Sequence, residues 1–293
     1  MSKGPDHSLD LIRKVRLLDL VSKKNAISLL DGHYLTEISG KGTEFKEARK
    51  YVMGESIRLI DWNMTARLGE PFVKVFQEER ERNIYIALDI SPSMYLGWQE
   101  RTKIDYAVEL AATLAYSAIK SGDRLGYLFF QDKVVAEAPA KRGKRQFYHF
   151  LNQMVRYKEN PPSSGKTDIR AAIHSLQKKK GHRFVVFLIS DFIDLDLPDD
   201  LRYLVASHDL ALVHVYDPFE YTNYKYFRFL GNDPENPMHN AFVKKEIRSL
   251  VEQEAHLKEI SSKYGLTWSS FSTNSDPSRM LRHFFESKKR ISR

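Results

Sequence analysis

The sequence predicts a three-layer α/β fold, in which helices cover both faces of a six-stranded, mainly parallel sheet with one antiparallel edge strand. After Asn83, short apolar runs alternate with amphipathic stretches, as in a sheet that lies between two layers of helices. Several runs are almost continuously apolar, which is typical of parallel strands buried on both faces. Two runs are separated only by Asp132 and Lys133, which is too short for a parallel crossover and therefore indicates an antiparallel hairpin.

The elements follow in chain order. Strands are expected at 84–90, 125–131, 134–139, 184–190, 210–216 and 266–272. Helices are expected at 103–121, 144–156, 168–179, 199–207, 241–264 and 277–287. The first helix has apolar residues at three- and four-residue steps, which gives it one apolar face. Thr102, with Asp105 three residues later, resembles a capping box at its start.

Residues 1–82 differ in character from the rest of the chain. They are rich in glycine, charge and aromatic residues and have no long helical period, so we expect a small β-rich or irregular N-terminal element. Residues 83–293 then form the α/β domain. Within it, residues 217–240 contain several Pro, Asn and Gly and are expected to form a surface excursion.

The composition excludes several classes of protein. The 293 residues include no cysteine, which excludes disulfide scaffolds, thiolate zinc sites, iron–sulfur clusters and cysteine nucleophiles. The N-terminus carries frequent charges, and no apolar run approaches the ~18 residues of a transmembrane segment. We therefore expect a soluble cytoplasmic protein.

The net charge of +8 is concentrated in one segment. Residues 141–183 contain twelve Lys or Arg and two acids, a net +10. We expect this segment to flank the functional edge of the sheet and attract an acidic partner through Lys141, Arg142, Lys144, Arg145 and Lys166. Two alternatives stay open. The segment, with Phe147 and Tyr148, could bind nucleic acid or another anionic surface, or it could be a solvated basic face.

Polar residues follow the predicted strands where parallel sheets bind their ligands, outside the carboxyl ends. Asp89, Ser91 and Ser93 follow the first strand, Asp191 follows the fourth, and Thr167 precedes the helix before the fourth. Oxygen donors with few charges suit a hard cation, so we expect Mg²⁺, with Mn²⁺ or Ca²⁺ as alternatives.

Each of these residues also has a purely structural interpretation. Ser-Pro-Ser could form a turn, Thr167 could be a helix N-cap, and Asp191 could be one solvated acid among the five in residues 191–200. Their joint placement at one sheet edge favours the metal site.

The D-x-S-x-S pattern, with a later Thr and Asp, resembles the metal-ion-dependent adhesion site of von Willebrand factor A (vWA) domains. This resemblance implies a Rossmann-like vWA fold, with Ser91, Ser93 and Thr167 near the metal and Asp89 and Asp191 acting partly through water. Other motifs resemble the domain-of-unknown-function family 58: G-x-G-x-E-F at residues 40–45, R-x-I-D-W-N at 58–63, Asp217-Pro218 with Glu220, and a closing His283-Phe284-Phe285. For the first two motifs we expect a structural role, with Trp62 in a core.

The second resemblance implies a non-enzymatic co-factor of a MoxR-type AAA+ ATPase, acting in chaperone-like assembly or metal insertion. An acidic side chain of that partner would complete the metal shell. Enzyme motifs fail on spacing: position 160 is Asn where a P-loop requires Gly, no histidine pair has the spacing of an H-E-x-x-H zinc site, and no G-x-S-x-G occurs. A metal-dependent hydrolase is a further alternative, although no general base stands out.

Overall fold

The computed structural model describes residues 16–21, 43–53, 56–57, 60–78, 82–97, 101–162, 167–179, 183–193, 198–199, 201–222 and 250–291. The chain divides into two compact units, one of residues 36–82 and one of residues 1–35 with 83–293. The division after residue 82 lies where the sequence predicts a boundary. Residues 1–35, however, group with the α/β unit and not with the N-terminal element.

The α/β unit is built on a six-stranded sheet with the order β5-β4-β3-β6-β7-β8. Its strands are β3 (Asn83–Asp89), β4 (Arg124–Phe130), β5 (Val134–Lys141), β6 (Phe184–Ser190), β7 (Asp209–Tyr216) and β8 (Thr267–Ser272). Neighbouring strands are parallel except β4 and β5, which are antiparallel. The predicted fold class is therefore confirmed, including its antiparallel edge. The strand order reverses between β3 and β6, which is where sheets of this kind bind ligands.

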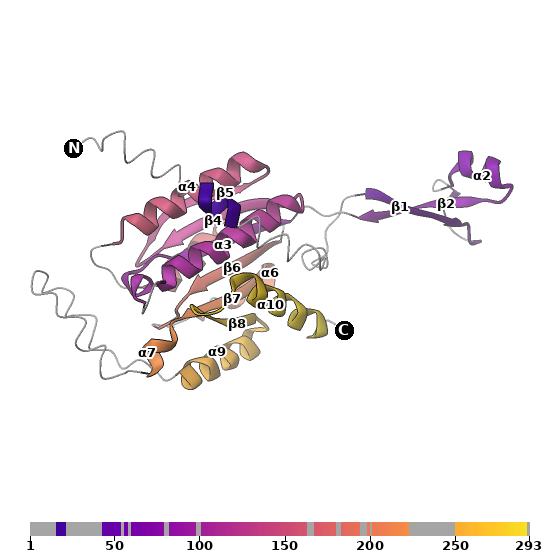
Figure 1. Cartoon of the computed structure of the whole chain (residues 1–293). Coiled ribbons are helices and arrows are strands. Elements are labelled where there is room, and N and C mark those ends of the chain that lie inside the picture. Colours follow the sequence, from indigo (N-terminus) through magenta and orange to yellow (C-terminus); the bar gives the residue numbers. More distant parts are fainter. Residues whose placement is uncertain are drawn as a thin grey trace, which may run out of the picture. The chain divides into compact units, whose positions relative to one another are not determined.

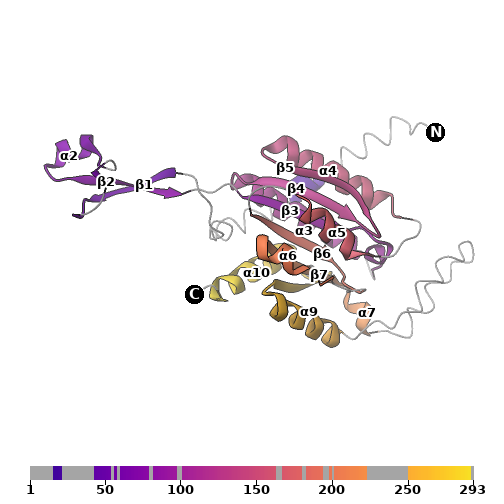
Figure 2. The same ribbon diagram turned by 180° about the vertical axis from the view of Figure 1, so that it is seen from behind.

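Helices cover both faces of this sheet (Figure 1). One face carries α3 (Lys103–Lys120), α4 (Lys144–Glu159) and α10 (Pro277–Ile291). The opposite face, seen in Figure 2, carries α5 (Ile169–Gln177), α6 (Leu201–Ser207) and α9 (Leu250–Tyr264). These are the predicted helices with slightly shifted ends, except that 241–249 lie outside the described residues. A short helix, α7 (Pro218–Thr222), begins the predicted excursion, and residues 223–240 of the excursion lie outside the described residues.

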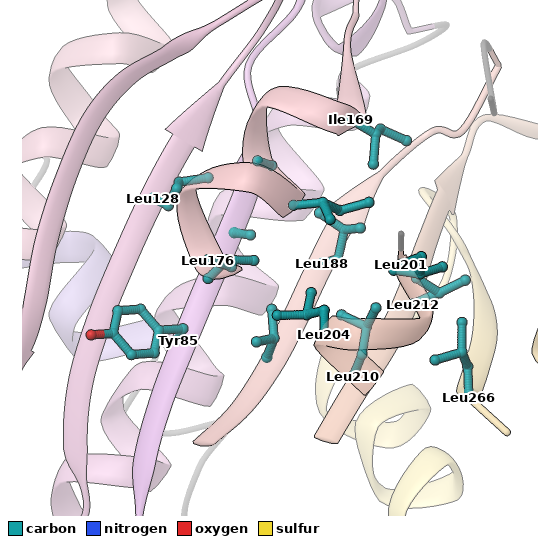
Figure 3. Packing of buried hydrophobic residues seen from close by; sticks show 14 of the residues in the cluster. Tyr85, Leu128, Ile169, Leu176, Leu188, Leu201, Leu204, Leu210, Leu212 and Leu266 are labelled. Carbon is teal, nitrogen blue, oxygen red and sulfur yellow. The ribbon is translucent and has the colours of Figure 1, made fainter. Parts of the chain in front are cut away.

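The alternation of side chains along β4 shows how both layers are held to the sheet. Tyr127 and Phe129 pack on the ring of Phe150 in α4, with ring centroids 5.4 and 5.9 Å away. Leu128 and Phe130 point to the other face, where they join the core beneath α5, α6 and α9. Figure 3 shows this second core. Because both faces of the strand are covered, its sequence carries no charge after the exposed Arg124.

The capping box at the start of α3 is confirmed. The Thr102 side chain accepts a hydrogen bond from the backbone N–H of Asp105, and the Asp105 carboxylate accepts one from the backbone N–H of Thr102 at 2.9 Å. Asp105 also pairs with Lys158 of α4 at 2.6 Å. The capping residues thus fix the start of α3 and connect it to the end of the neighbouring helix.

Residues 16–21 form a short helix that contacts the α/β unit. The hydroxyl of Tyr148 in α4 donates a hydrogen bond to the carboxylate of Asp19 at 3.2 Å. This contact is one physical reason why the first residues of the chain group with the sheet. In the part of the chain that the structure describes, no helix combines the length and the apolar character needed to cross a membrane.

The smaller unit contains an antiparallel pair of strands, β1 (Thr43–Lys50) and β2 (Phe72–Glu78), and the short helix α2 (Trp62–Leu68) between them. Asp61 caps α2 by accepting hydrogen bonds from the backbone N–H groups of Asn63 and Met64. The Asp of the R-x-I-D-W-N motif therefore has a structural role.

The expected core position of Trp62 is wrong. Trp62 is 65% exposed, and α2 contributes no buried residue. Trp62 is the first residue of the helix, whereas the helix is bonded to β2 from its middle, where the hydroxyl of Thr65 accepts a hydrogen bond from the backbone N–H of Phe72 at 3.0 Å. Nothing in the described part of this unit covers the indole ring.

We expect Thr102→Ala to lower the free energy of unfolding by about 1 kcal/mol, because it removes the side-chain oxygen that caps α3. Urea denaturation followed by circular dichroism measures the change. Thr102→Ser keeps a capping oxygen and should stay within about 0.5 kcal/mol of the wild type. Equal losses for both variants would show that the cap contributes nothing.

Candidate functional site

Parallel pairing of β3 with β6 places two acidic residues at the same edge of the sheet, the one where the carboxyl ends of the parallel strands meet. Leu88 pairs with Ile189, so Asp89 lies beside Ser190, and Asp191 follows directly. Asp89 is 0% exposed and Asp191 is 1% exposed. Asp191 is therefore not a solvated acid, which removes the structural alternative considered for it.

Hydrogen bonds fix the carboxylate of Asp89 from both strands. Its Oδ1 accepts from the backbone N–H of Ser91 at 2.8 Å, and its Oδ2 accepts from the hydroxyl of Ser190 at 2.6 Å. The Ser190 hydroxyl in turn accepts from the backbone N–H of Phe192 at 3.1 Å. Phe192 has a φ of 49°, a left-handed conformation that bulky residues rarely adopt. This strained residue lies in the loop that carries Asp191.

The two predicted serine ligands lie next to each other. Their hydroxyl oxygens are 3.1 Å apart, because Pro92–Tyr95 form one turn of 3₁₀ helix after Ser91. The turn interpretation is therefore correct, and the turn itself brings the hydroxyls together. Ser91 is buried, whereas Ser93 is partly exposed.

Thr167 directly precedes a residue that is bonded to the end of β4. The backbone N–H of the next residue, Asp168, donates to the carbonyl of Gln131 at 2.8 Å, and β4 neighbours β3 in the sheet. Asp168, not Thr167, caps α5, by accepting from the backbone N–H of Arg170 at 3.0 Å. The partly exposed Thr167 is thus not the cap. Among the described residues, no hydrogen bond joins Thr167 to the other four predicted ligands.

A lysine that the sequence analysis missed lies in the middle of this edge. Lys103, the first residue of α3, is 0% exposed. Its Nζ is 2.8 Å from Oδ2 of Asp191 and 2.5 Å from Oε1 of Glu220 in α7. Its burial could have been predicted from its spacing in the sequence. Lys103 precedes Ala107 and Ala111 by four and eight residues and therefore lies on the buried face of the helix.

A second chain of contacts returns from α7 to the same loop. Gln253 of α9 donates to the backbone carbonyl of Asp191 at 2.7 Å, and its own side-chain carbonyl accepts from the hydroxyl of Tyr221 at 2.7 Å. Tyr221 is the neighbour of Glu220 in α7. Asp191 is therefore held to α7 through its carboxylate, by way of Lys103, and through its backbone, by way of Gln253.

The electrostatics show an excess of buried acid. Burial, followed by the repulsion of Asp191, raises the pKa of Asp89 from its usual 3.8 to about 7. Burial likewise raises the pKa of Glu220. For Lys103, burial lowers the pKa, but the attraction of Asp191 and Glu220 outweighs it, so the net pKa lies above its usual value. One buried ammonium thus faces more carboxylates than it can neutralise.

The buried His214 does not supply the missing positive charge. It lies beside Ser190 in the register of β6 and β7, and burial lowers its pKa to about 3. Its Nδ1 shares a hydrogen bond with the Ser270 hydroxyl at 2.9 Å. At neutral pH the imidazole is uncharged, so among the described residues it adds no counter-charge for the acids at this edge.

These residues suit a small divalent cation. Carboxylate and hydroxyl oxygens are the donors that Mg²⁺ accepts, and a cation would relieve the repulsion that raises the pKa of Asp89. In the described ranges, no three His, Cys, Asp or Glu side chains are arranged to hold a metal ion. The predicted ligand set is not a cluster of that kind, because it consists of three hydroxyl side chains and only two acids.

The structure separates the basic cluster from this edge, contrary to expectation. Lys141 pairs with Leu125 at the start of β4, whereas Asp89 pairs with Phe130 at its end. Because β5 runs antiparallel to β4, it carries the chain to the opposite edge, where Lys141, Arg142, Lys144 and Arg145 are all exposed. They do not flank the candidate site. Lys166 lies outside the described residues.

Solved structures similar to this chain have low sequence identity. A conserved hypothetical protein, BatB from Bacteroides thetaiotaomicron, matches at 15% identity over 71% of this chain and 99% of its own, with a TM-score of 0.47. The vWA domain of SpRpn10 matches at 11% identity over 71% of this chain and 95% of its own, with a TM-score of 0.38. Likenesses this weak add nothing to what the topology itself shows.

The sequence comparisons are stronger. Uncharacterized proteins of Mycobacterium tuberculosis (Rv1480) and Mycobacterium bovis (Mb1516) are each 30% identical to this chain over 219 residues, which cover 74% of the chain and 69% of the relative. Residues 47–254 match the family model described as "Protein of unknown function DUF58". This match includes the R-x-I-D-W-N motif, Asp89, Lys103, Asp191 and Glu220, and the chain therefore belongs to the DUF58 family.

Proposed function

We propose that this protein is a non-enzymatic interaction module that binds an acidic side chain of a partner through a divalent cation, Mg²⁺ in the first instance. The cation would be held by Asp89, Ser91, Ser93, Thr167 and Asp191. It supplies a positive centre with an open coordination position, which binds a carboxylate more strongly than a surface salt bridge does.

The observation that carries this proposal is the burial of Asp89 and Asp191 side by side, where the part of the chain that the structure describes supplies one buried ammonium, that of Lys103. Uncompensated buried carboxylates are costly, and groups with strongly raised pKa values are common at functional sites. A bound cation would explain why two buried carboxylates lie side by side, which core packing does not explain.

The direction of approach follows from exposure. The two acids are buried, whereas Ser93 and Thr167 are partly exposed. A partner would therefore reach the ion from the side of the hydroxyls. His214 is wholly buried and cannot act as a general base toward an outside substrate, which favours binding over hydrolysis.

As the family resemblance implies, the partner we propose is a MoxR-type AAA+ ATPase that acts with this protein in chaperone-like assembly or metal insertion. This proposal keeps the cytoplasmic location expected from the sequence, where an ATPase finds its ATP.

We expect Asp89→Asn to weaken Mg²⁺ binding more than about tenfold, because it removes one of two acidic ligands without changing side-chain size. Calorimetric titration with MgCl₂ measures the affinity, and pull-down from native lysate with and without Mg²⁺ measures the partner. The matched control is Asp209→Asn, since Asp209 begins β7 at the other sheet edge and pairs with Arg183 at 2.8 Å. Partner capture that is unchanged in excess chelator would contradict the proposal.

The pKa of Asp89 predicts a stability difference that depends on pH. A raised folded-state pKa gives stability that is complete below the unfolded value of 3.8 and is lost as pH rises through about 7. In chelator, the free energy of unfolding of the wild type should fall relative to Asp89→Asn between these values, on the order of 1 kcal/mol per pH unit.

The comparison with Asp89→Asn is needed because the lowered pKa of His214 produces the opposite slope, and both proteins retain that residue. Added Mg²⁺ should remove the fall, since the cation stabilises the ionised carboxylate. Parallel pH profiles of the two proteins in chelator would show that Asp89 does not titrate in this range.

The exposed basic cluster at the opposite edge supports a separate, second candidate function, the binding of an anionic surface or nucleic acid. Lys141, Arg142, Lys144 and Arg145 lie beside the exposed Tyr148, and charge with aromatic side chains suits single-stranded nucleic acid. Oligonucleotide affinity should then fall steeply as salt increases. Absence of binding at low salt would reduce this cluster to a solvated face.

A further inference from the structure

We infer that Lys103 is a built-in cation that keeps Asp191 from direct contact with the divalent ion and so leaves a coordination position for the acid of a partner. This inference rests on the proposed function, because it concerns how the same site uses its ligands. It assigns a positioning role to Lys103, which touches Asp191 and Glu220 and none of the proposed hydroxyl ligands.

The two oxygens of Asp191 differ in how they are engaged. Oδ2 receives the Lys103 ammonium at 2.8 Å, whereas from the described residues Oδ1 receives only a long contact, from the backbone N–H of Ile193 at 3.4 Å. A divalent ion bound directly to Oδ2, about 2.1 Å away, would lie close to the ammonium. Like charges at that separation repel strongly in a buried site, so the ion is displaced toward Asp89 and the hydroxyls.

Lys103 is itself held in place. Glu220 binds the ammonium from α7 at 2.5 Å, and both partners of the lysine are buried. The loop of Asp191 cannot easily move away from Lys103, because Gln253 binds its backbone carbonyl and Tyr221 fixes Gln253. The separation between Asp191 and the ion is thus built into three elements, α3, α7 and α9.

The consequence for binding concerns charge. With Asp89 as the direct acidic ligand, the ion keeps more of its positive charge than it would with two. An outside carboxylate then gains more from binding the ion. Lys103 therefore lowers the affinity of the site for the metal ion alone. It raises the affinity of the metal-loaded site for a carboxylate of the partner.

The test measures Mn²⁺ affinity from the electron paramagnetic resonance signal of free Mn²⁺. We expect Lys103→Met, which keeps the length of the side chain but not its charge, to bind Mn²⁺ about tenfold more tightly or better, since Asp191 becomes available as a direct ligand. The control, Asp209→Asn, changes an acid that pairs with Arg183 at 2.8 Å at the start of β7, away from the site, and should change the affinity less than about threefold.

Removal of a buried cation can prevent folding, so Lys103→Met/Glu220→Gln, which removes one charge of each sign, is the second variant and should also bind more tightly. A crystal structure of the Mn²⁺-loaded wild type needs no variant at all. A water between Asp191 and Mn²⁺, with Lys103 still on Asp191, is the expected result, and direct coordination by Asp191 with Lys103 displaced overturns the inference.

The outcomes separate this inference from the proposed function. Wild-type binding with no gain of affinity in either folded variant refutes the role of Lys103 and leaves the metal site standing. Absence of Mn²⁺ binding in the wild type and in all variants refutes the metal site and the inference with it. Binding that appears only without Lys103 supports the inference and refutes the metal site of the native protein.

Discussion

Parallel pairing of β3 with β6 is the constraint on which the polar architecture of this protein depends. It brings the ends of two apolar strands together, so that Asp89 and Asp191 leave the sheet at adjacent points beneath covering helices. Water cannot solvate them there, so polar groups of the protein take its place. Ser190 donates to Asp89, Lys103 to Asp191, and Gln253 to the backbone between the strand and the loop.

Such an arrangement is poorly explained as a device for stability. A buried ion pair recovers in attraction roughly what it loses in desolvation, and apolar residues of the same volume often stabilise a core more. Buried charges do provide structural specificity, because few arrangements of the surrounding elements satisfy their hydrogen bonds and ion pairs. The contacts between Lys103, Glu220 and Asp191 specify how α3 and α7 meet the loop after β6, which is useful if that loop has to present a ligand in one geometry.

Sequence reasoning located the strands because central parallel strands are apolar on both faces and stand out as uninterrupted runs, as Phe184–Ser190 does. It located the edge acids because such strands end together. It missed Lys103, since a lysine at the first position of a helix is ordinarily a surface residue and only its ion pairs explain its burial. It misplaced Lys141 because nearness in sequence to Thr167 says nothing of direction, and an antiparallel strand led to the other edge. Trp62 was misjudged because large aromatic residues are buried only when another element covers them.

The wholly buried strand β6 also matters before the protein has folded. Phe184–Ser190 is buried at all seven positions, and an unfolded chain exposes it as an uncharged, β-prone segment of the kind that starts aggregates. Parallel sheets assemble slowly because their contacts are distant in sequence, which lengthens this exposure during synthesis. Arg183 precedes the strand and Asp191 follows it, so a charged residue flanks the aggregation-prone segment at each end. In the unfolded chain Asp191 thus occupies the flanking position from which a charge opposes self-association of such a segment, in addition to its place at the folded edge.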